Sequence, residues 1–138
     1  MKKIILISLM LASQISFAQY TLVVKGKGTT NNAGTFRCLI FNSENGFPKE
    51  TARAKQFDNG TIAANTGTCI FENLPAGTYA VSTFHDKNNN QKLDTGLFGA
   101  PKEKYGFSND ASKPFSPPDF SAAAFKLNAN AQIIIQLK

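Results

Sequence analysis

The stretch FRCLIF at residues 36–41 decides the fold class, because its side chains change character at every second position. Phe36, Cys38 and Ile40 form one apolar face, and Arg37 begins the other. Successive side chains of a β-strand point to opposite faces of a sheet, so this spacing is typical of a half-buried strand. The chain is therefore expected to contain β-structure at its centre.

The same period of two continues through most of the chain. It recurs in Tyr20–Lys25, Thr68–Phe71, Thr78–Phe84, Ala123–Leu127 and Ile133–Leu137. Gly, Pro and Asn separate these stretches, as turn residues do between short strands. We therefore predict an all-β fold, a seven-stranded antiparallel Ig-like β-sandwich with one long ordered loop.

Two shorter signals lie between the stretches 36–41 and 68–71. Residues 49–57 have the only helical spacing, enough for a turn or two. Asn59-Gly60 then predicts a tight reversal into a further strand.

The long loop is expected between Phe84 and Phe120, where the alternation stops for more than thirty residues. A segment of this length in a compact domain is usually functional, tied down or disordered. Gly99-Ala100-Pro101 and Ser116-Pro117-Pro118 punctuate it with stiff turns.

The loop opens with a pattern of oxygen-bearing side chains. Asp86, Asn88, Asn90 and Asp94 occupy relative positions 1, 3, 5 and 9, the spacing of a calcium-binding loop, in which position 7, here Lys92, gives its backbone carbonyl. A calcium ion bound by these five residues is one interpretation. The other is an uncharged turn, because Asp and Asn also cap their own backbone.

The N-terminus has the form of a secretory signal. Lys2 and Lys3 precede the apolar run 4–11, and Ser16-Phe17-Ala18 is a small-x-small cleavage site. We predict that residues 1–18 are removed after Ala18 and that residues 19–138 form a single domain in the periplasm or outside the cell. The apolar run is too short for a membrane span of about 20 residues, so the protein is not expected to be membrane-spanning.

The charge of the chain argues against nucleic-acid binding. The formal net charge is +6 and falls to +4 without Lys2 and Lys3, and the basic residues are scattered singly. The expected partner is an envelope or extracellular ligand, such as a glycan, a peptide or a protein.

The two cysteines, Cys38 and Cys69, both lie in strand-like stretches. In an oxidising compartment such a pair most often forms one disulfide. Two separate buried thiols are the alternative.

A second polar cluster follows the Asp/Asn loop. Glu103, Tyr105 and Asn109 are candidates, with His85, for lining a ligand-binding groove. Alternatively, Tyr105 and the aromatic residue Phe107 only pack the loop onto the domain.

Several motifs in the same order carry a family resemblance. Leu74–Val81, which contains an L-P-x-G-x-Y sequence, is similar to the turn leading into a strand of prealbumin-like and collagen-adhesin B-type sandwiches. Together with Gly46-Phe47-Pro48, His85–Asp94 and Gly99–Asn109, it resembles the DUF2141 family of exported bacterial proteins. The resemblance implies export and a prealbumin-like sandwich. The Asp/Asn loop is also similar to the D-x-N-x-N-G-x-x-D loops of surface adhesins, with Gln91 in place of the glycine.

No catalytic motif is present in the sequence, so the protein is not expected to be an enzyme. The favoured function is an exported, calcium-stabilised binding or structural protein of the cell envelope. A metal-free structural module and an envelope hydrolase using His85, Asp86 and Glu103 are the alternatives.

Overall fold

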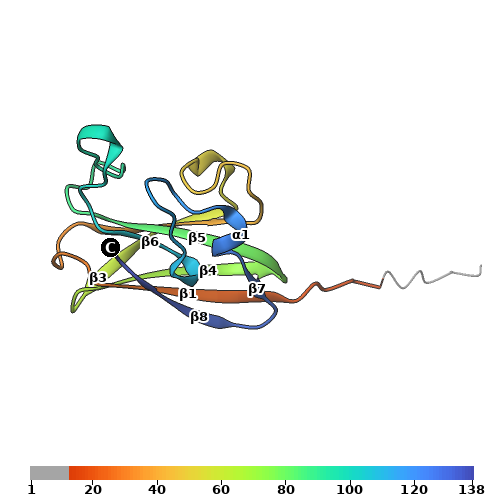
Figure 1. The fold of residues 1–138 in the computed structure, drawn as a ribbon. Coiled ribbons are helices and arrows are strands. Elements are labelled where there is room, and N and C mark those ends of the chain that lie inside the picture. The colour runs from red at the N-terminus through yellow and green to blue at the C-terminus, as the bar shows by residue number, and fades with distance from the viewer. Residues whose placement is uncertain (1–12) are drawn as a thin grey trace, which may run out of the picture.

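The computed structural model describes residues 13–138. The predicted n-region and the apolar run 4–11 of the signal lie outside the described residues. Of the predicted signal, the structure describes the segment 13–18, which precedes Gln19. That segment has no regular structure and leads away from the body as an extended tail (Figure 1). Within the described part of the chain, no helix is both long and apolar enough to cross a membrane.

Eight strands form the body. They are β1 (Gln19–Lys27), β2 (Thr35–Phe41), β3 (Gln56–Ala63), β4 (Thr66–Pro75), β5 (Gly77–Asp86), β6 (Tyr105–Phe107), β7 (Phe125–Leu127) and β8 (Ala131–Gln136). Short helical turns lie at η1 (Thr51–Arg53), η2 (Leu97–Gly99), η3 (Ser108–Asp110) and α1 (Phe120–Ala123). The all-β prediction is confirmed, and the expected helical turn within residues 49–57 is η1.

The strands follow one hydrogen-bonded path in the order β6-β5-β2-β3-β4-β1-β8, and β7 pairs with the beginning of β5. The path nearly closes on itself, because Tyr105 in β6 and the C-terminal Lys138 exchange backbone hydrogen bonds of 2.9 and 3.3 Å. The result is a barrel-like sheet (Figure 1) around one cluster of buried apolar side chains. The expected division into the two sheets of a sandwich is not confirmed.

The prediction of seven strands, all antiparallel, is wrong in two respects. Residues 13–138 contain eight strands, and β1 and β8 run parallel, with Leu22 opposite Ala131 and Lys27 opposite Gln136. Residue alternation reports which side chains face the core, and it is the same for either strand direction. The additional strand is β6. It is three residues long and lies in the segment without alternation, so the sequence pattern did not indicate it.

The Asn59-Gly60 pair is not a turn but lies inside β3. The reversal into β4 occurs at Ala64 and Asn65, both of which have positive φ angles. Gly60 is needed for another reason: a Cβ atom there would collide with the Thr68 carbonyl of β4. The first half of β3 pairs with β2 and the second with β4, so β3 carries the sheet from one side of the core to the other.

The core is organised around the fully buried ring of Phe36. Gly26 of β1 and Gly67 of β4 pair across the sheet, and a Cβ atom on either would collide with this ring. Cys38 and Cys69 lie in the same core with their sulfur atoms 2.12 Å apart. The predicted disulfide is therefore present, and it links β2 to β4.

Tyr79 anchors the beginning of β5. Its hydroxyl donates a hydrogen bond of 2.7 Å to the Pro75 carbonyl, which closes the turn of the L-P-x-G-x-Y sequence. Burial raises the pKa of the Tyr79 phenol above its ordinary value of 10.0.

We predict that Gly67→Ala destabilises the domain by about 1–3 kcal/mol, because the new methyl group displaces the Phe36 ring from a filled core. Urea unfolding measures the effect. Gly77→Ala is the matched control: the nearest atoms to its Cβ are at ordinary contact distance, 3.5 Å, so its effect is expected within about 0.5–1 kcal/mol. Equal losses for the two variants would contradict this account of the core.

Candidate functional site

The buried carboxylate of Asp86 organises the start of the long loop. Asp86 is the last residue of β5 and is fully buried. Its Oδ2 accepts hydrogen bonds from the Arg37 Nε at 2.5 Å and the Gln91 amide at 2.9 Å. Its Oδ1 accepts one from the Asn90 amide at 3.1 Å. A buried charge needs such partners, and here they come from a neighbouring strand and from the loop itself.

Arg37 links Asp86 to the next strand of the sheet. It lies on β2 between β5 and β3, and its second nitrogen donates a hydrogen bond of 2.6 Å to the Asn59 side chain of β3. Sequence reasoning missed Arg37 as part of the site, since a charged residue in an alternating strand is read as facing solvent.

The backbone of the 86–91 turn is sharply curved. Asn89 and Gln91 have φ angles of +55° and +67°, in the left-handed region. Gln91 stands at relative position 6, where calcium loops keep a glycine for the sharp turn, and it adopts the backbone conformation that favours glycine. Gly34, with φ +79°, lets the neighbouring strand end approach this turn, because a Cβ there would collide with the Asp86 carbonyl.

The remaining polar side chains converge on Asp94. The Asn88 and Asn90 amide nitrogens each lie 2.6 Å from one oxygen of the Asp94 carboxylate. The Asn90 side-chain oxygen accepts the Lys92 amide at 3.0 Å, which places the Lys92 backbone within the same turn. The four side chains that the spacing singled out are thus joined in one hydrogen-bonded loop.

Glu103 ties the far end of the loop to its beginning. It is buried, and its two oxygens accept the Lys87 amide at 2.9 Å and the Asp94 amide at 3.0 Å. The Asp94 carbonyl in turn accepts the Lys102 amide at 2.8 Å. Glu103 therefore acts through the backbone and holds residues 87–94 against residues 102–103.

His85 is a structural residue of the same region. Its ring is fully buried, Nδ1 accepts the Thr30 amide at 3.2 Å, and Nε2 lies 2.7 Å from the Ala33 carbonyl. Since Nδ1 accepts, the proton is on Nε2, which donates. Both ring nitrogens are engaged with the backbone, so neither is available for proton transfer to a substrate.

The donor set suits only a hard cation. Among residues 13–138, no three His, Cys, Asp or Glu side chains form a group that could hold a metal ion. A cation at this loop would depend on the Asp94 carboxylate, the spare side of Asp86 Oδ1, the Asn88 and Asn90 oxygens and the Lys92 carbonyl. Oxygen donors of low total charge fit weak calcium binding, and they fit zinc or copper poorly.

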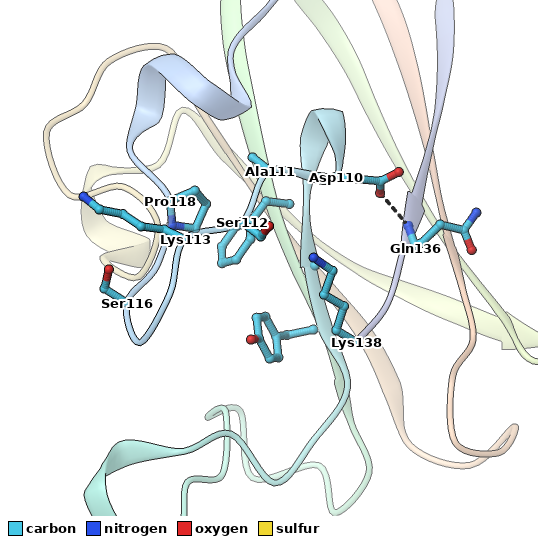
Figure 2. Close-up of a pocket in the computed structure, with 11 residues that line it drawn as sticks. Asp110, Ala111, Ser112, Lys113, Ser116, Pro118, Gln136 and Lys138 are labelled. Carbon is cyan, nitrogen blue, oxygen red and sulfur yellow. Dashed lines mark hydrogen bonds between the residues drawn. The ribbon is translucent and has the colours of Figure 1, made fainter.

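The other two residues proposed for a ligand groove lie apart from this loop. Tyr105 lines a small cavity of about 30 Å³ between β6, β8 and residues 110–118, which Figure 2 shows. Neither His85 nor Glu103 lines it. Asn109 faces away to α1, where its side-chain nitrogen donates to the carbonyls of Ala122 and Ala124. The cavity has room for about one water molecule.

The aromatic residues of the loop make packing contacts. Tyr105 and Phe107 alternate along β6 with ring centroids 5.8 Å apart. Phe107 also lies 6.1 Å from the ring of Phe47, which in turn contacts Phe41 and Phe120. These contacts fasten the loop and α1 to the sheet.

Comparison with known protein families places the chain. The model of the family described as "Uncharacterized protein conserved in bacteria (DUF2141)" matches residues 24–135. The chain belongs to the DUF2141 family. The resemblance drawn from its motifs is confirmed, and the match spans the sheet from β1 to β8 and includes the Asp86–Glu103 loop. No curated protein and no solved structure matches the chain.

Replacing Glu103 with Ala is expected to destabilise the domain by about 2–4 kcal/mol, because two amides lose a charged acceptor. The variant should also be cleaved faster by trypsin at the lysines of residues 87–102. Glu103→Gln keeps acceptor capacity and should lose less.

The matched control for this loss is Glu72→Ala, at an exposed position on β4, with an expected effect within about 0.5 kcal/mol. Denaturant unfolding and limited proteolysis provide the two readouts. Glu103→Ala behaving like Glu72→Ala in both would refute the structural role of Glu103.

Proposed function

We propose that this chain is an exported domain of the bacterial cell envelope that binds a calcium ion at Asp86–Asp94 and uses it to hold the 87–104 segment in place. The observation that carries the proposal is the convergence of Asn88 and Asn90 on the Asp94 carboxylate. An Asn side chain presents either its nitrogen or its oxygen by turning about its last bond. With a cation as partner, the same side chains offer two amide oxygens beside a carboxylate.

The backbone supports this reading. Gln91 already has the left-handed conformation that the sharp turn of a calcium loop requires. Asp86 is fixed by three donors and retains an unused side of Oδ1, so one ligand oxygen is held in place before the ion binds. Preorganised ligands reduce the ordering that binding costs.

Export is proposed on separate grounds. The basic start, apolar run and Ser16-Phe17-Ala18 site of the N-terminus have the form of a secretory signal. The Cys38–Cys69 disulfide fits an oxidising compartment, where such bonds persist. Calcium is also abundant enough outside the cytosol to fill a weak site, with a dissociation constant of about 10⁻⁴ to 10⁻³ M.

The proposed role of the ion is mechanical. Residues 87–104 leave the sheet at Asp86 and return at Tyr105, and hydrogen bonds rather than a buried apolar core hold their base. A cation that joins Asp86 to Asp94 would stiffen this base. The segment would then present its outer turns to an envelope partner in one fixed arrangement.

Calcium titration of residues 19–138, which contain all eight strands, tests the proposal. At about 10 mM calcium, binding to the folded state alone should stabilise the domain by about 1–3 kcal/mol, which raises the melting temperature by about 5 °C or more. Asp94→Asn removes the charged ligand and should abolish the increase. Asp119→Asn, at an exposed position outside residues 86–94, should retain it. Either a wild-type domain whose melting is insensitive to calcium or an undiminished response in Asp94→Asn would reject the site.

A further inference from the structure

Three large apolar side chains are exposed to solvent on two turns of the long loop between Phe84 and Phe120. Leu97 is 85% exposed, Phe98 106% and Phe115 110%. The two phenylalanines are more exposed than any other large apolar residue in the described part of the chain. Such side chains project beyond their surroundings, and large apolar surface left in solvent often marks an interaction site.

Both turns are fixed rather than frayed. In the first, the Gly96 amide donates to the Ala100 carbonyl at 2.7 Å, and Thr95 and Pro101 form a β-bridge. In the second, Lys113 and Ser116 form a bridge around the turn. Phe98 and Phe115 have φ angles of +60° and +58°, a conformation that residues with a side chain rarely adopt. Strained positions of this sort cluster at functional sites.

The two turns emerge next to the same strand end. The first belongs to the segment that re-enters the sheet at Tyr105. Ser112, Lys113 and Ser116 of the second line the small cavity together with Tyr105 (Figure 2). In Figure 1 both rise on the upper side of the view, beyond β5 and β6. We call Leu97, Phe98 and Phe115 the apolar tips.

The surface around the apolar tips is basic. Between residues 87 and 119 there are five lysines, all exposed, and four acidic residues, so the formal charge is 5 − 4 = +1. One of the lysines, Lys113, pairs with Asp119 at 3.3 Å. The lysines are Lys87, Lys92, Lys102, Lys104 and Lys113. Among the acids, Glu103 is buried and Asp110 accepts the Gln136 amide. The charge presented outward is therefore predominantly positive.

We propose that the apolar tips and their lysines dock this domain onto an anionic lipid surface. The tips are separate projections and not the walls of a groove, so they need no shape-matched partner to become buried. A lipid interface accepts apolar side chains to a shallow depth, and its phosphate groups attract nearby lysines. This inference does not depend on calcium: the tips and lysines are in place without the ion.

Vesicle co-sedimentation of residues 19–138 tests the proposal, in the presence of a chelator and again with calcium. Vesicles of phosphatidylglycerol and phosphatidylethanolamine should bind the wild-type domain, and vesicles of phosphatidylcholine should bind it weakly. The double variant Phe98→Ser/Phe115→Ser should bind about 100-fold more weakly, at about tenfold for each ring removed from the interface. Lys102→Gln/Lys104→Gln should bind anionic vesicles about 30-fold more weakly.

Phe57→Ser is the matched control, because Phe57 is 61% exposed on β3, outside both turns. It should bind vesicles like the wild type, and all variants should keep the wild-type melting temperature within a few degrees, since no substituted side chain belongs to the core. Absence of binding to anionic vesicles overturns the proposal. So does equal binding by Phe98→Ser/Phe115→Ser, or a concentration-dependent dimer that this variant abolishes, which would assign the tips to a second copy of the chain. Loss of the calcium response alone leaves the vesicle result unchanged, so the two proposals fail separately.

Discussion

The arrangement of the loop depends on one buried charge, the carboxylate of Asp86. Arg37 neutralises it from the neighbouring strand, and the amides of Asn90 and Gln91 also donate hydrogen bonds to it. A buried carboxylate without such partners would be strongly destabilising, so the turn that follows β5 must keep its curvature for as long as the sheet is folded. Because Asp86 belongs to β5, the sheet determines where the 87–104 segment begins.

Glu103 is a second buried carboxylate of this kind, at the other end of the 87–104 segment. It is also buried and also accepts two backbone amides, so the segment is closed by a carboxylate at each end of its base. The outer turns then have little need to contribute to stability. This division explains how Phe98 remains exposed in an unfavourable backbone conformation, because the base of the segment fixes its turn. Phe115 lies outside this segment, in the turn closed by the Lys113–Ser116 bridge.

Much of the strand content followed from the sequence, and the pairing did not. Alternation located β1, β2 and β4 because buried residues recur at every second position along most of each strand. It gave no sign that β8 pairs parallel to β1, since direction leaves no trace in the pattern. Gly60 misled because the glycine of a turn and the glycine of a close strand contact look alike in sequence.

The sequence predicted the residues of the site that are close together in the chain and missed the role of those that are distant. The spacing of Asp86, Asn88, Asn90 and Asp94 marked a turn whose members are close in the chain, and local spacing carries that information. Arg37 binds a group that is 49 residues away in the chain, and Glu103 binds two amides that are 16 and 9 residues away. Only the folded sheet brings them there. Further, a carboxylate that binds backbone amides has no partner side chain that a motif search would recognise.

Amide hydrogen exchange at Asn90 and Gln91 tests most directly whether the Asp86 carboxylate holds the loop. Both residues are exposed, so without the two hydrogen bonds their amides would exchange like those of an unstructured peptide. We expect exchange slowed by about 100-fold or more in the wild-type domain, and near-peptide rates in Asp86→Ala under conditions where the sheet amides remain protected. Peptide-like exchange at both positions in the wild-type domain would contradict the account.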